Sequence, residues 1–189
     1  MVLPDESRLW QELQVASWDR AHAWRTPVLA TVDAQGLPEA RTVVLRSADF
    51  ATRWLVFFTD VRSPKAVQLL ARPAACLVFW CPQLQWQLRV RVDVRIETMG
   101  PRVEAAWQKM SASGAAREYL SPLAPGSPLA STPAPGAPLG RPPASLPGGA
   151  THFSVLRAGV TSMDWLGLSP KGEHRRVRFE GGRFEPLTP

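Results

Sequence analysis

Residues 86–96 alternate strictly between apolar and polar side chains, and this pattern constrains the fold more than any other stretch of the chain. The apolar positions are Trp86, Leu88, Val90, Val92, Val94 and Ile96, and the polar positions are Gln87, Arg89, Arg91, Asp93 and Arg95. Successive side chains of a β-strand point to opposite faces of a sheet, so one face of this strand is core and the other is polar. The polar face can meet solvent, a ligand or a second subunit.

Other strand patterns extend this reading to a mainly β protein. Further strands are expected at 27–32, 40–46, 54–59, 75–80 and 152–156, and a closing hairpin at 175–179 and 184–187 around the Gly181-Gly182 turn. Helices are expected around Leu9, Leu13 and Ala16, at 64–71 and at 102–119. The sequence therefore predicts a β-barrel of six to eight antiparallel strands, closed or partly closed, with flanking helices.

The segment 121–150 has a different composition from the rest of the chain. Nine of the 19 prolines and five of the 13 glycines fall in it, and Arg141 is its only charged residue. Proline and glycine at this density do not form the interior of a helix or a strand. We therefore expect a single domain over residues 1–189 that carries a Pro/Gly/Ala-rich loop insert at about 121–150.

Charge and cysteine content limit the classes of partner. The net charge of +6 raises nucleic acid as a partner, but the dense arginines between 171 and 183 lie in strand-patterned sequence rather than on a flexible arm. The acidic N-terminus and the absence of a run of about 18 apolar residues indicate a cytoplasmic protein without a membrane segment. Cys76 and Cys81 lie too far apart along an extended strand to form a disulfide. With three histidines in the chain, no metal site is expected.

The tripeptide Ser63-Pro64-Lys65 predicts a helix start with an anion site. Serine is a preferred N-cap and proline fits the first helical position, so we expect Ser63 to cap a helix over 64–71. The unpaired N–H groups and the helix dipole at that start favour an anion. Lys65 adds a positive charge, and Arg41 can add a bidentate guanidinium. The alternative is that Ser63 is only a cap and Lys65 only a solvated charge.

Together these motifs resemble the pyridoxamine 5′-phosphate oxidase-like family of FMN-binding split barrels. The motifs that carry the resemblance lie at 41–46, 56–59, 63–66 and 87–90, and at Trp165 with 174–176. They fall within 20–110 and 152–189, which is most of the chain. Their order and spacing are more specific than any one of them alone.

The resemblance implies a set of contacts to FMN. The phosphate would meet Arg41, Ser63, the Pro64 position and Lys65; the ring and the ribityl chain would lie along Val43, Val44, Phe58 and Thr59; and Gln87, Trp165 and Arg176 would complete the pocket. Arg46 takes the place of a substrate-facing lysine, and His174 is the best candidate for a catalytic base. The family's pocket forms between two subunits, so a homodimer with the flavin site at the interface is implied.

The chain also departs from the family's pattern. Pro64 stands where the oxidase has an arginine, and Phe58 replaces a tyrosine. On the helix after the long strand, Trp107, Ser111 and Ala115 offer no arginine for a substrate phosphate. The resemblance therefore implies a flavin-dependent oxidoreductase that passes a hydride from a small molecule, not necessarily pyridoxamine phosphate, to flavin N5. The alternatives are an FMN-binding module without turnover, serving as a carrier or regulator, and a basic barrel that binds nucleic acid.

Overall fold

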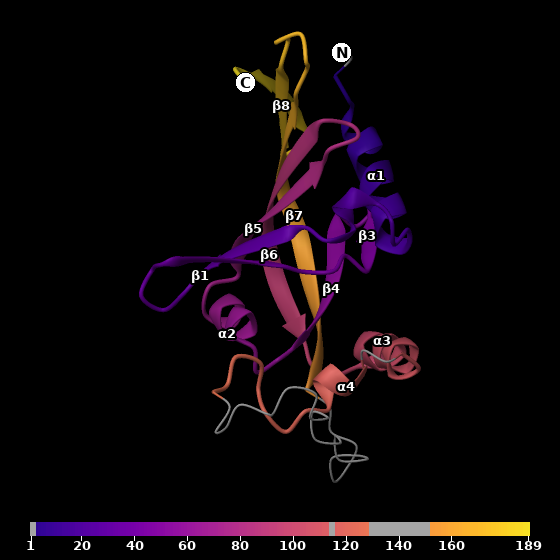
Figure 1. Ribbon diagram of the computed structural model, residues 1–189, viewed down its shortest axis with the longest axis vertical. Coiled ribbons are helices and arrows are strands. Elements are labelled where there is room, and N and C mark those ends of the chain that lie inside the picture. The colour runs from indigo at the N-terminus through magenta and orange to yellow at the C-terminus, as the bar shows by residue number, and fades with distance from the viewer. Residues whose placement is uncertain (1–2, 114–115, 129–151) are drawn as a thin grey trace, which may run out of the picture.

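The computed structural model describes residues 3–113, 116–128 and 152–189 (Figure 1). The strands are β1 (Val28–Val32), β2 (Pro38–Thr42), β3 (Ser47–Asp49), β4 (Trp54–Asp60), β5 (Ala74–Cys81), β6 (Trp86–Glu97), β7 (Phe153–Gly167), β8 (Arg175–Glu180) and β9 (Arg183–Leu187). The helices are α1 (Glu6–Trp18), the short 3₁₀ helix η1 (Ala23–Arg25), α2 (Pro64–Ala71), α3 (Pro101–Ser111) and α4 (Ala116–Tyr119). Most of the loop insert predicted at 121–150 lies outside the described residues.

A single antiparallel sheet connects the nine strands of the described ranges. The order is β2-β1-β5-β6-β7-β4-β3, with β8 beside β7 and β9 beside β8. Strand β7 is 15 residues long; β6 pairs with it from Val155 to Gly167, while β4 pairs with its first half, Phe153–Gly159, and β8 with its last part, Ser162–Gly167. Within the described chain β2 and β3 remain edges, so the sheet is a split barrel that does not close. The predicted mainly β fold with flanking helices is confirmed. The described residues form one strand more than the eight predicted, β3, which is too short to show an alternation in sequence.

Strand β6 has the two faces that its alternation predicted. Leu88 and Val90 are fully buried, whereas Arg89 on the opposite face is exposed. Leu88 lies between Phe79 of β5 and Trp165 of β7 in the sheet, and both of these side chains are also fully buried. The apolar face of β6 is therefore the centre of the main core.

Helix α1 covers one end of this core, beside β3 (Figure 1). The Asp5 carboxylate accepts a hydrogen bond from the Arg8 N–H at 2.8 Å, which caps the helix start. Leu9, Leu13 and Ala16 are fully buried on one side of the helix, as their spacing predicted. Their burial against the sheet fixes α1 in place.

A second, smaller core lies under α3 and α4, away from α1 (Figure 1). It contains Val103, Met110, Tyr119, Phe153 and Val155, with Phe58 and Trp107 packed against it. The continuous helix predicted over 102–119 is wrong, because α3 ends at Ser111 and α4 begins at Ala116. Ser113 donates both its N–H, at 2.9 Å, and its hydroxyl, at 2.7 Å, to the Met110 carbonyl, and this tight turn replaces the next helical hydrogen bond.

The strand predicted over 40–46 also ends early, at Thr42. The next hydrogen bonds change partner: the Leu45 N–H donates to the Arg25 carbonyl at 2.9 Å, and the Arg46 N–H donates to the Val56 carbonyl at 2.8 Å. The chain therefore crosses here from the β1 side of the barrel to β4, and a regular strand cannot continue through the crossing. The C-terminal hairpin agrees with its prediction, since Gly181 and Gly182 have φ values of 56° and 76° in the turn between β8 and β9.

The structure also describes the two cysteines, the candidate metal ligands and the character of the helices. Cys76 and Cys81 are both free, the first half-buried and the second buried. In the described part of the chain no three His, Cys, Asp or Glu side chains lie close enough together to hold a metal ion. None of the helices in the described ranges combines the length and the apolar character that a membrane crossing requires.

Candidate functional site

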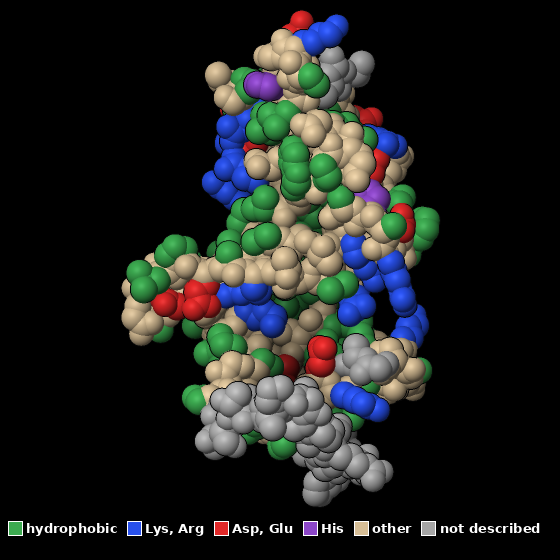
Figure 2. Space-filling view, in the orientation of Figure 1, with side chains coloured by type: hydrophobic (Ala, Val, Ile, Leu, Met, Phe, Trp, Pro, Cys, Tyr) green, Lys and Arg blue, Asp and Glu red, His purple; other side chains and the backbone are tan. Residues whose placement is uncertain are grey.

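A hollow of about 350 Å³ lies where the β1–β2 hairpin meets the start of α2. It is lined by Glu39, Ala40, Arg41, Ser63, Pro64, Lys65, Pro125 and Gly126. Figure 2 shows basic side chains gathered between the hairpin and α2, with acidic ones beside them on the hairpin side. The structure therefore brings together the four residues expected at a phosphate: Arg41, Ser63, Pro64 and Lys65.

Arg41 is fixed by contacts to the hairpin and to α2. Its Nη2 donates to Glu39 Oε2 at 2.8 Å and to Gln68 Oε1 at 3.3 Å, and its Nη1 donates to the Thr31 hydroxyl. The Thr31 hydroxyl in turn donates to Gln68 Oε1 at 2.6 Å. Because Gln68 lies on α2, this network ties the helix to the β1–β2 hairpin and holds the guanidinium at the edge of the hollow.

Lys65 is a second cation in the same place, in the first turn of α2. Burial lowers the pKa of its ammonium group below the usual value, and the positive charge of Arg41 lowers the pKa further. The Asp60 carboxylate acts in the opposite direction but does not outweigh them. Two cations that repel each other at a helix start are the arrangement that an anion would stabilise.

Ser63 is the N-cap residue of α2, as predicted, but its side chain makes no hydrogen bond to the helix start. The helix has no hydrogen bond from its N-terminal N–H groups to the Ser63 hydroxyl. The hydroxyl oxygen lies 3.1 Å from the Thr59 hydroxyl oxygen instead, and both residues are buried. Thr59 is the last but one residue of β4, so its hydroxyl competes for Ser63 in a way that the local sequence did not reveal. The α2 start is left without a side-chain cap from Ser63, which suits an external anion.

Arg46 and Phe58 meet beside the second core. The Arg46 guanidinium carbon lies 5.3 Å from the centre of the Phe58 ring, and the Phe58 ring packs edge-on against Phe153 at 5.0 Å. The Nε of Arg46 is buried and has no hydrogen-bond partner among the described residues. Of the two valines expected near a flavin, Val43 is buried in the main core and Val44 is half-buried. Val43 can therefore offer a ligand its backbone rather than its side chain.

Gln87, Trp165 and Arg176 form a separate group on β6, β7 and β8. Gln87 and Arg176 both pair with Leu166 of β7, so they occupy the same row of the sheet. Trp165 is fully buried, and its ring packs edge-on against Trp86 at 5.4 Å. In a single chain its side chain therefore points into the main core, away from the surface that Gln87 shares with Arg176.

Asp164 belongs to the same surface, and the sequence reading missed it. Its carboxylate accepts Arg176 Nε at 2.9 Å and Arg176 Nη2 at 2.8 Å, and Arg89 Nη2 at 2.5 Å. Burial alone would raise the pKa of this carboxyl, but the hydrogen bonds from Arg176 and Arg89 outweigh it and the pKa lies below its usual value. A lone acid between Met163 and Trp165 is the only sequence signal for this contact.

His174 lies in the connection between β7 and β8. It is exposed, and its Nδ1 accepts a hydrogen bond from the Ser169 N–H at 3.1 Å. In Figure 1 this connection is at the opposite end of the molecule from α2. One chain therefore does not bring His174 close to the hollow at Arg41 and Lys65.

Sequence comparison finds relatives for the N-terminal half of the chain. A family model described as pyridoxamine 5′-phosphate oxidase, FMN-binding domain, matches residues 7–98. The chain is 47% identical over 79 residues to the pyridoxine/pyridoxamine 5′-phosphate oxidase of Chromohalobacter salexigens, which covers 42% of this chain and 35% of that protein. The first curated relatives are thus matched over about a third of their length.

Comparison with solved structures extends the similarity to the whole fold. A pyridoxamine 5′-phosphate oxidase-related, FMN binding protein from Nostoc punctiforme has a TM-score of 0.70 and 25% identity, with all of both chains covered. PhzG from Burkholderia lata, solved in complex with tetrahydrophenazine-1-carboxylic acid, has a TM-score of 0.71 and 20% identity over 100% of this chain and 98% of its own. With the matched domain and the split barrel in agreement, the chain belongs to the pyridoxamine 5′-phosphate oxidase-like family of FMN-binding split barrels.

Proposed function

We propose that this protein binds FMN, with the phosphate in the hollow at the start of α2. The observation that carries the proposal is the pair of cations Arg41 and Lys65, which line one hollow at a helix start; Glu39 pairs with Arg41 from the hairpin side, whereas the Asp60 carboxylate does not offset the effect of burial and of Arg41 on Lys65. A phosphate monoester is a dianion of the size that a helix start and two basic side chains bind well. The donors present therefore fit the phosphate end of FMN.

The flavin ring would extend from the hollow along Val44 and the crossing at residues 43–46. Phe58 offers an aromatic surface there, and Arg46 lies against it with an unsatisfied buried Nε. Gln87 and Arg176 share another surface of the same chain. Because this surface is separate from the hollow at Arg41 and Lys65, the proposal includes a homodimer in which each copy supplies Gln87 and Arg176 to the other's site, while Trp165 stays in the core of its own chain.

The proposed activity is flavin-dependent oxidation or reduction of a small molecule. When bound, FMN supplies a ring that accepts a hydride at N5 and passes the electrons to a second acceptor. The protein's part is to bind and orient: Arg176 places a positive charge near the ring, and His174 is the candidate that would hold a proton at an imidazole nitrogen. Trp107 is one of the positions where the resemblance would require a group that binds a substrate phosphate. Its ring packs against Phe153 and Tyr119 instead, at ring distances of 5.4 and 6.4 Å, so the substrate need not carry a phosphate.

Ion pairing disfavours the alternative of a basic barrel that binds nucleic acid. Arg89 and Arg176 share the Asp164 carboxylate, and Arg178 pairs with Glu185 at 3.6 Å. These contacts neutralise part of the arginine-rich surface of β6 and β8, whereas phosphate-backbone binding requires free positive charge. No contact in the described chain favours a nucleic acid over a flavin.

The test is titration of the purified protein with FMN and, as a matched control, with riboflavin, which lacks the phosphate. We expect quenching of FMN fluorescence and much weaker binding of riboflavin; equal, weak binding of both would contradict the proposed site. Anaerobic reduction by NAD(P)H and peroxide release from pyridoxamine 5′-phosphate then test turnover. If FMN binds and neither reaction occurs, an FMN-binding module without turnover replaces the oxidoreductase.

A further inference from the structure

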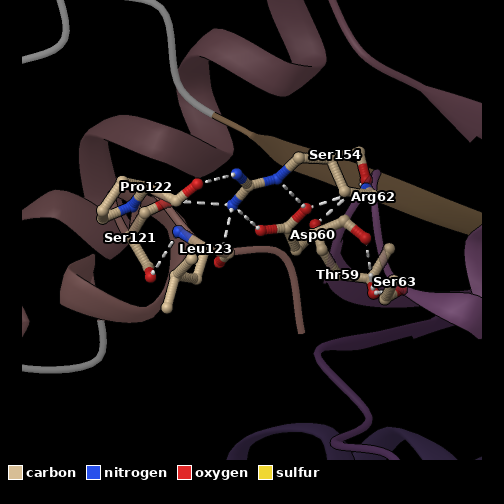
Figure 3. A network of polar contacts seen from close by, with 8 residues as sticks. All are labelled: Thr59, Asp60, Arg62, Ser63, Ser121, Pro122, Leu123 and Ser154. Atoms are coloured by element: carbon tan, nitrogen blue, oxygen red, sulfur yellow. Dashed lines mark hydrogen bonds and ion pairs between the residues drawn. The ribbon is translucent and has the colours of Figure 1, made fainter. Parts of the chain in front are cut away.

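Arg62 lies in the turn between β4 and α2 and joins Asp60, at the end of β4, to a segment about 60 positions later in the chain (Figure 3). On one side it binds Asp60: Nε donates to Oδ1 at 3.0 Å and Nη2 donates to Oδ2 at 2.7 Å. The Arg62 N–H also donates to Asp60 Oδ1, at 2.8 Å. Because Asp60 is only 5% exposed, this two-point ion pair fixes the orientation of the guanidinium.

The same guanidinium binds three consecutive carbonyls in the segment after α4. Nη2 donates to the Ser121 oxygen at 2.9 Å and to the Leu123 oxygen at 3.4 Å, and Nη1 donates to the Pro122 oxygen at 3.2 Å. Only the planar, five-donor guanidinium can reach a carboxylate and several carbonyls at once. Arg62 is thus a clasp that joins the α2 turn to residues 121–123, about 60 positions later.

The clasped segment continues into a wall of the hollow. Pro125 and Gly126 line it together with Arg41 and Lys65. Gly126 has a φ of 84°, and a Cβ there would lie 3.6 Å from the Pro64 side chain. The segment therefore packs directly on the first residue of α2, and a glycine is the residue that fits this turn.

Arg62 itself is not placed to bind the anion. Its Nε and both of its Nη atoms are engaged with Asp60 and with the three carbonyls, and its charge is offset by the Asp60 carboxylate. It can influence a bound phosphate only through the segment that it holds.

We propose that Arg62 is a positioning residue that holds residues 121–126 against α2 as one wall of the anion site, and so slows release of the phosphate end of the ligand. The ligand's identity rests on the proposed function, whereas the clasp does not. Loosening the clasp should open the phosphate end of the site and leave the ring end unchanged. The effect should therefore depend on whether the ligand carries a phosphate.

The test uses Arg62→Lys, which keeps the charge but cannot bind Asp60 and the carbonyls together. We expect the Kd and the dissociation rate of FMN to rise about tenfold, in line with loss of one charge-assisted contact, and those of riboflavin to stay unchanged. Arg102→Lys is the matched control, because Arg102 pairs with Glu97 at 3.0 Å on the exposed surface of α3. Unchanged FMN release, or an equal change for FMN and riboflavin, would overturn the proposal.

A second measurement separates this proposal from the proposed function. Leu123 is 52% exposed in the clasped segment, so chymotrypsin cleavage after Leu123 reports how firmly the segment is held. We expect cleavage of the ligand-free protein to be faster in Arg62→Lys than in the wild type; equal rates would overturn the clasp even if FMN binds. Wild-type protein that fails to bind FMN would instead overturn the proposed function. If Arg62→Lys does not fold, Gly126→Ala disturbs the same wall with Arg62 intact, and it should give the same FMN-selective loss.

Discussion

Asp164 and Arg176 form a two-point ion pair between neighbouring strands β7 and β8, with nitrogen–oxygen distances of 2.9 and 2.8 Å. Arg89 of β6 binds the same carboxylate, so one acid with 8% exposure joins three strands. The contact also fixes Arg176, which we place at the flavin ring. Asp164 therefore affects both the stability of the sheet and the geometry of the proposed site.

We expect Asp164→Asn to lower the free energy of unfolding at neutral pH by about 1–3 kcal/mol, because both arginines lose a charged partner. The folded-state pKa of Asp164 lies below its usual value near 3.8, so its contribution is complete above that value and is lost as the pH falls through the lower folded-state pKa. Urea unfolding at pH 7 and near pH 3 should show the difference between variant and wild type narrowing at the lower pH. Asp93→Asn, an exposed acid on β6, is the control and should change little. A difference that persists at both pH values would mean that the carboxylate's charge is not the cause.

The second prediction concerns the two cations of the hollow. Arg41→Ala and Lys65→Ala should each weaken FMN binding by about 1–3 kcal/mol, the range for a lost charge-assisted hydrogen bond. Riboflavin binding should not change, since it has no phosphate for these side chains. Fluorescence titration of both ligands against both variants checks this. FMN affinity that survives both substitutions would place the phosphate elsewhere.

If FMN binds at the proposed site, Lys65 should make its affinity depend on pH. Burial lowers the pKa of Lys65 most, and the positive charge of Arg41 lowers it further. A bound phosphate would raise this pKa again. Binding therefore favours the protonated form, and the FMN affinity should be constant at lower pH and fall as the pH rises through the depressed pKa of the free protein. Lys65→Met should remove this fall. Titrations between pH 7 and pH 10 test it, and an identical pH profile in Lys65→Met would assign the dependence to another group.

The local features of this fold could be predicted from the amino-acid sequence, whereas the contacts between distant segments could not. The β6 faces and the bounds of α2 were predictable because alternation and the Pro64 helix start act within a few residues. The Arg62 clasp was not predictable, because its carbonyl partners lie about 60 positions later in the chain and every residue offers a carbonyl that could accept the same hydrogen bond. Ser63 shows the same limit: its N-cap position was predictable from its neighbours, but the local sequence did not reveal that its hydroxyl pairs with Thr59 of β4 instead of with the helix start.

A packing prediction concerns Gly159 of β7, which faces Trp54 of β4. A Cβ at Gly159 would lie 3.2 Å from the Trp54 ring, and Arg157 stacks on that ring at 4.1 Å. Gly159→Ala should therefore lower the free energy of unfolding by about 1–3 kcal/mol through overpacking. In a Trp54→Leu background the same substitution should cost less, because the smaller side chain leaves room. A double-mutant cycle by urea unfolding measures this, and additive effects would show that the ring is not the obstacle.

The last prediction concerns the proposed homodimer. Trp80 of β5 is 41% exposed and lies beside Gln87 of β6 in the sheet. On the other side of β5, Val28 of the neighbouring strand β1 is 36% exposed and pairs with Val78. Val78 and Trp80 share one face of β5, so an apolar surface adjoins the row that contains Gln87 and Arg176. If a second copy covers this surface and contributes to the flavin site, Trp80→Glu should shift the protein toward the monomer and weaken FMN and riboflavin binding together. Light scattering and fluorescence titration test the two effects, with Met99→Glu, at an 82% exposed position between β6 and α3, as the control. A monomeric wild type that binds FMN tightly would instead show that one chain holds the cofactor by itself.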